Sequence, residues 1–110
     1  MKMTVLLIKP GMEPEVVDID SGLESLQEAV GGDIAATYPY EDPVAIICND
    51  NGKIMNLPWN RALRDENGEI YDIIAGNFLI VGLTEEDFGS LSDELIGKYK
   101  ALFNVEGTFL

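Results

Sequence analysis

The residues best suited to chemistry lie close together in the second half of the chain. Both arginines of this acidic sequence, Arg61 and Arg64, stand within four positions of each other and near carboxylates. A guanidinium can hold a carboxylate or phosphate through two parallel hydrogen bonds, so this stretch could bind an anionic ligand or a neighbouring chain segment. The candidate binding residues are Trp59, Asn60, Arg61, Arg64, Asp65, Tyr71 and Asp72.

Two interpretations of the arginines remain open. In the structural one, Arg61 and Arg64 pair with nearby Asp or Glu residues and pin a hairpin. In the functional one, they hold an anion while Asp65 or Asp72 acts as a general base, which describes a small-molecule-binding or hydrolytic domain. The functional interpretation requires both guanidiniums to converge on one concave pocket.

Several kinds of catalytic site lack the residue types that they need. The chain has no histidine, which removes Ser–His–Asp and Cys–His catalysis. One cysteine, Cys48, without any histidine also excludes a structural zinc site. No glycine-rich nucleotide motif occurs. We therefore assign no catalytic residue, no metal ligand and no cofactor, and we expect a non-enzyme more than an enzyme.

The apolar pattern around these residues predicts a small α+β domain. Short apolar or alternating runs bounded by Pro-Gly and Asn-Gly turns predict a mainly antiparallel, hairpin-rich sheet of about five to seven strands. The expected strands are 3–8, 15–19, 34–40, 44–48, 53–57 and 78–83, with a further hairpin turn at Asn67-Gly68. The run 44–48 is apolar throughout, which predicts a central strand covered on both faces.

Two helices are expected to pack on this sheet. Ser21 and Glu24 form a capping-box pattern ahead of a two-turn helix, and Gly31-Gly32 supplies its C-terminal cap. A second capping pattern, Ser90-Leu91-Ser92-Asp93, precedes apolar residues at helical spacing, namely Leu91, Leu95, Ile96, Tyr99, Leu102 and Phe103. Residues 104–110 are expected to form a short tail or a final edge strand.

Size and charge restrict the partners. A chain of 110 residues fits a single domain, 1–110. Seven basic against twenty acidic residues give a net charge of −13, which argues against direct binding of nucleic acid and against anionic membranes. We expect cationic or neutral partners, and a cytoplasmic location because the chain has one cysteine and no run of transmembrane length.

The stretch from Leu57 to Gly82 carries a long pattern, Leu-Pro-x-Asn-Arg-Ala-Leu-Arg-Asp-Glu-x-Gly-Glu-x-Tyr-Asp-Ile-Ile-x-Gly-x-Phe-x-Ile-Val-Gly. This pattern resembles the bacterial domain-of-unknown-function family numbered thirty-eight forty-six, and the resemblance extends from the opening strand to the last helix. It implies an origin in Gram-positive bacteria, their phages or conjugative elements, and no activity. Trp59 departs from the residue expected in relatives, so the resemblance does not make it a functional centre.

We therefore expect an acidic, non-enzymatic protein-binding domain that serves as an accessory or antirestriction-type factor of a phage or conjugative element. One form of this hypothesis is DNA mimicry, although the same charge also serves solubility. Tyr38, Tyr40 and Trp59, which stand beside prolines, either cover the core or belong to an interface. The alternative is the anion-binding or hydrolytic domain. A homodimer through an edge strand such as 34–40 is compatible with either.

Overall fold

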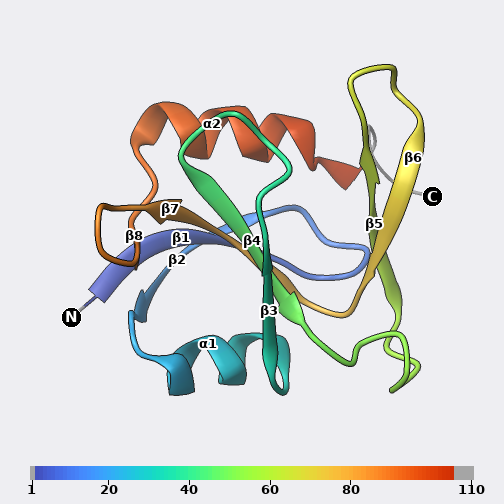
Figure 1. The fold of residues 1–110 in the computed structure, drawn as a ribbon, viewed down its shortest axis with the longest axis horizontal. Coiled ribbons are helices and arrows are strands. Elements are labelled where there is room, and N and C mark those ends of the chain that lie inside the picture. Colours follow the sequence, from blue (N-terminus) through green and yellow to red (C-terminus); the bar gives the residue numbers. More distant parts are fainter. Residues whose placement is uncertain (1, 106–110) are drawn as a thin grey trace.

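The computed structural model describes residues 2–105 and confirms the predicted α+β fold class (Figure 1). Its eight strands are β1 (Lys2–Ile8), β2 (Glu15–Asp20), β3 (Ile34–Thr37), β4 (Val44–Asn49), β5 (Trp59–Arg64), β6 (Ile70–Ala75), β7 (Phe78–Leu83) and β8 (Phe88–Gly89). The two helices are α1 (Leu23–Val30) and α2 (Asp93–Leu102). Strands therefore dominate the described residues, and the helices cover them.

Six strands form the main antiparallel sheet, in the order β2-β1-β7-β4-β3, with β8 paired to the end of β7. The predicted β1–β2 hairpin is present, and its register runs from the Lys2–Asp20 pair to the Leu7–Glu15 pair. β7 lies between β1 and β4 and so occupies the centre of the sheet. β5 and β6 form a separate two-stranded hairpin, which turns through Gly68 at a φ of 81° as the Asn-Gly signal predicts.

The main sheet has an apolar core on each face, because successive residues of a strand point to opposite sides. Figure 1 shows α1 and α2 on opposite sides of this sheet, with the β5–β6 hairpin at one end. The core beneath α1 contains Met3, Val5, Leu26, Ala45, Ile47, Leu79 and Val81. The core beneath α2 and the hairpin contains Leu6, Ile8, Val44, Ile46, Leu63, Ile74, Phe78, Ile80, Leu91, Tyr99 and Phe103. β4 contributes to both cores, as its uniformly apolar sequence predicts.

The sequence predicts caps at three helix ends, and the structure has a cap at two of them. α2 begins within the predicted Ser90–Asp93 pattern, but its N-cap is Ser92 and not Ser90; the Ser92 hydroxyl accepts a hydrogen bond from the Leu95 N–H at 3.2 Å. Gly31 ends α1 in the left-handed conformation at φ 80°. The capping box predicted at Ser21 is wrong, because the N-cap is Gly22 and no side chain caps this end. Within residues 2–105, no helix is long and apolar enough to cross a membrane.

Two of the predicted strands need correction. The strand expected over 34–40 ends at Thr37, three residues before Tyr40. The segment 53–57 forms no strand, because the backbone from residue 50 to 56 closes local turns in which Met55 N–H donates to Asn51 O and Leu57 N–H donates to Gly52 O. The chain then enters β5, which pairs with β6 instead of β4. The two-residue strand β8 was not predicted by any pattern in the sequence. Residues 106–110, where a tail or edge strand is expected, lie outside the described residues.

Two glycines provide a matched test of the packing between β7 and β8. A Cβ added at Gly82 would lie 2.2 Å from the Ser90 carbonyl oxygen, whereas one added at Gly97 in α2 would have no neighbour within 4 Å. Gly82→Ala should lower the free energy of unfolding by about 2 kcal/mol through this backbone clash. Gly97→Ala should raise it by about 1 kcal/mol, because alanine is the better helix former. Urea unfolding measures both, and equal midpoints would show that Ser90 does not lie against β7.

Candidate functional site

The seven residues predicted as one site lie in four different environments. Two are buried, three line an open groove beside α2, one lines a smaller pocket, and Trp59 is 55% exposed at the start of β5. Neighbours in a strand face opposite sides of it, and the β5–β6 pairing is further interrupted by register shifts at two points. Closeness in sequence therefore does not bring these side chains to one point.

Arg61 is completely buried and is the largest fully buried side chain of the described residues. Its Nε donates to the Phe103 carbonyl oxygen at 3.0 Å, and its Nη2 donates to the Met12 carbonyl oxygen at 2.6 Å. Its Nη1 donates to Oδ1 of Asn60 at 2.8 Å. Burial lowers the pKa of the guanidinium, and the nearby Glu13 carboxylate opposes this effect. Arg61 thus holds the end of α2 and the β1–β2 turn against the hairpin.

Asn60 extends this buried network to the main sheet. Its Nδ2 donates to the carbonyl oxygens of Ile8 and Gly76, at 2.9 and 2.8 Å. Ile8 ends β1 and Gly76 turns the chain into β7. A buried amide or guanidinium is costly unless its hydrogen bonds are made, and no buried side-chain polar atom of the described residues lacks a partner. Asn60 and Arg61 are therefore structural residues.

Three other predicted residues, Arg64, Asp65 and Tyr71, line a groove of about 820 Å³. This groove lies between the hairpin, α2 and the loop that follows β3. We call it the tyrosine groove, since Tyr40, Tyr71 and Tyr99 all line it. The tilted rings of Tyr40 and Tyr99 have their centroids 5.1 Å apart. The charged residues of the groove are Glu41, Asp42, Arg64, Asp65, Glu66 and Lys98.

An ion pair and a phenol hydrogen bond join two sides of the groove. Oδ2 of Asp42 accepts from Lys98 Nζ at 2.5 Å and from Tyr99 Oη at 2.7 Å. These two hydrogen bonds hold the pKa of the Asp42 carboxyl below its usual value. Burial, and then the hydrogen bond to Asp42, raises the pKa of Tyr99, so this phenol remains protonated at neutral pH.

The hairpin turn occupies two of the other charged groups. Arg64 Nη1 donates to the Gly68 carbonyl oxygen at 2.8 Å. Asp65 Oδ1 accepts from the backbone N–H groups of Asn67 and Glu69, at 2.9 and 3.0 Å. Both side chains therefore stabilise the turn of the hairpin.

Two carboxylates of the tyrosine groove stand apart from these contacts. Within the part of the chain that the structure describes, Glu41 and Glu66 make no side-chain hydrogen bond or ion pair, and both are exposed. They are the carboxylates of the groove that remain available to a ligand.

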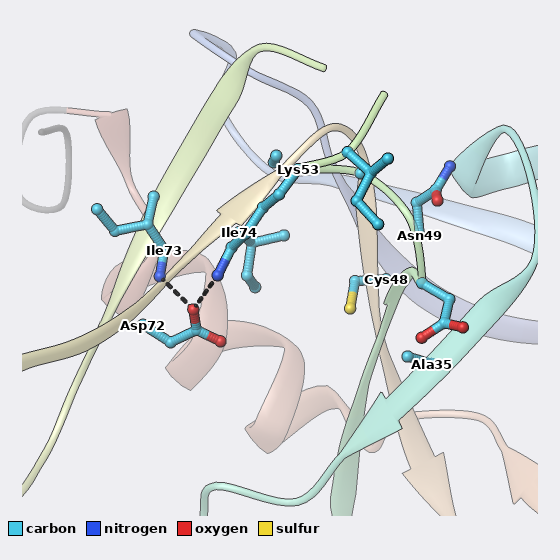
Figure 2. Close-up of a pocket in the computed structure, with 11 residues that line it drawn as sticks. Ala35, Cys48, Asn49, Lys53, Asp72, Ile73 and Ile74 are labelled. Atoms are coloured by element: carbon cyan, nitrogen blue, oxygen red, sulfur yellow. Dashed lines mark hydrogen bonds and ion pairs between the residues drawn. The ribbon is translucent and has the colours of Figure 1, made fainter. Parts of the chain in front are cut away.

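The seventh predicted residue, Asp72, faces a different pocket of about 310 Å³ (Figure 2). Figure 2 shows Lys53 Nζ and the Ile73 N–H converging on Asp72 Oδ1, at 2.6 and 2.8 Å, with Cys48 beside them. Burial raises the pKa of the Cys48 thiol, and the carboxylates of Asp72 and Asp50 raise it further. The thiol is therefore protonated at neutral pH and is a poor nucleophile.

The observed geometry keeps the two guanidiniums apart. Arg61 is buried against carbonyl oxygens, whereas Arg64 is exposed and lines the tyrosine groove. Among the described residues, no group of three or more Cys, Asp or Glu side chains is placed to hold a metal ion. The groove residues absent from the sequence-based set include Tyr40, Asp42 and Lys98, and the position of Tyr40 beside Pro39 was the one signal in the sequence that pointed toward them.

A comparison with protein families gives a match over nearly the whole chain. The family model described as Domain of unknown function (DUF3846) matches residues 1–104. No curated protein and no solved structure matches the chain. The family match confirms the resemblance carried by the pattern between residues 57 and 82, but it assigns no activity, so function has to be argued from the geometry.

The two arginines should differ sharply in their effect on stability. Arg61→Met leaves the buried carbonyl oxygen of Phe103 and the partly buried one of Met12 without these donors, and should lower the free energy of unfolding by about 3 kcal/mol. Arg64→Met, at an exposed position, should change it by less than about 0.5 kcal/mol. Urea unfolding followed by Trp59 fluorescence measures both, and equal effects would contradict the structural role of Arg61.

The Asp42 cluster should stabilise the fold in a pH-dependent way. The pKa of Asp42 is lowered in the folded protein, so its stabilising effect is present above the unfolded pKa of about 3.9 and is lost as the pH falls through the folded value. The difference in unfolding free energy between the wild type and Asp42→Asn should therefore be largest near neutral pH and shrink below about pH 4. Glu85→Gln, on the exposed 84–87 loop, removes one carboxylate in the same way and should change the unfolding free energy at neutral pH by less than about 0.5 kcal/mol.

Proposed function

Since the chain belongs to the family described as Domain of unknown function (DUF3846), which names no activity, we propose a function from the geometry of the tyrosine groove. The protein is a non-enzymatic protein-binding domain, and the groove takes a basic segment of its partner. One observation carries this proposal: a groove walled by tyrosine rings bears Glu41 and Glu66, two exposed carboxylates without partners among the described residues. The chemistry of the walls and their charge both support it.

The tyrosines suit a flexible basic side chain. Tyr71 is 54% exposed, Tyr40 is half-buried and Tyr99 is buried, so the groove offers rings at different depths. Tyrosine gives large contact areas at a small entropic cost and is favoured at protein interfaces. Its ring face also attracts cations, and Lys98 Nζ already lies 5.6 Å from the Tyr99 ring centroid. A lysine or arginine of a partner can place its methylene groups on these rings.

The charges of the groove favour a cation over an anion. Four carboxylates line it against two cations, and the whole chain has a net charge of −13. Lys98 is paired with Asp42, and Arg64 is bound to the Gly68 carbonyl oxygen. An anionic ligand would have to displace these contacts, whereas a cation meets Glu41 and Glu66 directly. The groove therefore supports protein binding over the anion-binding or hydrolytic alternative.

The proposal extends to the biological class that the family resemblance implies. We propose a cytoplasmic accessory or antirestriction-type factor of a phage or conjugative element. Proteins that bind DNA present clustered Lys and Arg to its phosphates, and such a basic surface is complementary to this groove. In the DNA-mimic form of the proposal, the carboxylates of this protein occupy the positions of phosphates.

A charge reversal inside the groove provides the test. A fluorescein-labelled peptide of three lysines spaced by glycine is the probe, and fluorescence anisotropy measures its dissociation constant. Glu66→Lys should weaken binding about tenfold, because it places a cation on the groove wall. Glu24→Lys makes the same change in net charge at an exposed position of α1, on the opposite side of the main sheet from α2. It should change the dissociation constant less than about twofold. Equal losses in the two variants would show attraction by net charge alone and would overturn the groove as the binding site.

A further inference from the structure

The two edges of the main sheet differ in charge. β2 forms one edge and carries Glu15, Asp18 and Asp20 within its six residues. β3 forms the other edge, and no charged residue occurs between positions 34 and 40. Charged side chains on an edge strand are a common device against pairing with another chain. The β2 edge is therefore protected, whereas the β3 edge is open to an added strand.

The hydrogen-bond pattern shows which backbone groups of β3 are available. Asp50 N–H donates to the Asp33 carbonyl oxygen at 2.8 Å, and the antiparallel register continues from Ile34–Asn49 to Thr37–Ile46. Hydrogen-bonded and non-hydrogen-bonded pairs alternate in an antiparallel ladder. Ala35 and Thr37 therefore bond toward β4, while Ile34 and Ala36 present their N–H and C=O groups at the open edge.

We infer that the β3 edge accepts an extended segment of the basic partner as an added antiparallel strand. This inference rests on the proposed function, because it concerns the partner that enters the tyrosine groove. β3 leads directly to Pro39 and Tyr40, which line that groove. A strand antiparallel to β3 would leave the groove, run about 13 Å along the four residues of β3 and end near Asp33.

Charge favours a basic partner over a second copy of this chain. Exposed Asp33 and Asp50 lie at one end of the β3 edge, and exposed Glu41 lies beyond the other. Each copy has a net charge of −13, so pairing two β3 edges would bring two strongly acidic molecules together. A partner segment that consists of an uncharged strand flanked by lysine or arginine avoids this repulsion. Its strand pairs with the uncharged backbone of β3, and its basic residues meet the carboxylates beyond the two ends of β3.

Synthetic peptides with a common lysine segment separate the edge from the groove. One peptide continues from three glycine-spaced lysines into Thr-Val-Thr-Val-Thr, and the other continues into Gly-Ser-Gly-Ser-Gly. The strand-forming tail should tighten binding about tenfold, since it adds backbone hydrogen bonds to Ile34 and Ala36. Two further peptides carry N-methyl groups on alternate residues of this tail, one on the threonines and the other on the valines. Only one of the two should lose the gain in affinity, because only one alternate set of N–H groups faces β3. Ala36→Pro, which removes an outward-facing N–H, should abolish the same gain and leave binding of the Gly-Ser peptide unchanged.

The outcomes distinguish this inference from the proposed function. If both peptides bind the wild type equally and Glu66→Lys weakens the binding of both, the added strand is overturned and the groove remains the binding site. If Glu66→Lys does not weaken the binding of the lysine segment, the proposal that the groove is the binding site is overturned. Because Ala36→Pro could disturb folding, the methylated peptides test the edge on the unmodified protein. Sedimentation gives the oligomeric state. If the wild type is a dimer and Ala36→Pro is a monomer, the β3 edge pairs with a second copy of the chain, and the inference is also overturned.

Discussion

A buried guanidinium bound to backbone carbonyl oxygens determines how the parts of this fold meet. Burying Arg61 removes a charge from water, and this cost is offset only if its donors are all bound. The bonds go to Phe103, Met12 and Asn60, at the end of α2, in the β1–β2 turn and in β5 itself. A shift of the hairpin relative to α2 would break several of these bonds together. The hairpin is therefore held at a defined angle to the sheet and the helix.

The tyrosine groove depends on that angle. One wall comes from the hairpin, with Arg64 and Tyr71, and the opposite wall comes from α2, with Lys98 and Tyr99. Neither wall contains Arg61, yet Arg61 joins both through β5 and the end of α2. Asp42 fixes the third side of the groove, the loop after β3, to α2, because its carboxylate receives hydrogen bonds from Lys98 and Tyr99. The surface proposed to bind a partner is thus positioned by contacts that lie beneath and beside it.

Local chemistry made much of the fold predictable, while the groove depends on distant contacts. The apolar run of β4, the Asn67-Gly68 turn and the Gly31 cap each depend on a few adjacent residues, and the structure agrees with the sequence there. The strand predicted at 53–57 failed because local turn hydrogen bonds replaced the ladder with β4. Asp42 meets Lys98 and Tyr99 over separations of 56 and 57 residues, and no local pattern indicates such pairs.

The contrast between Arg61 and Arg64 shows the same limit within one strand. Both are arginines of β5 near the same acidic residues, and the sequence treats them alike. Two of the three partners of Arg61 lie 42 and 49 residues away, whereas Arg64 bonds four residues ahead. One arginine therefore became part of the core and the other part of the surface. The family pattern between residues 57 and 82 combines both roles. Its length identifies the family, but it does not separate the residues that build the fold from those that could bind a partner.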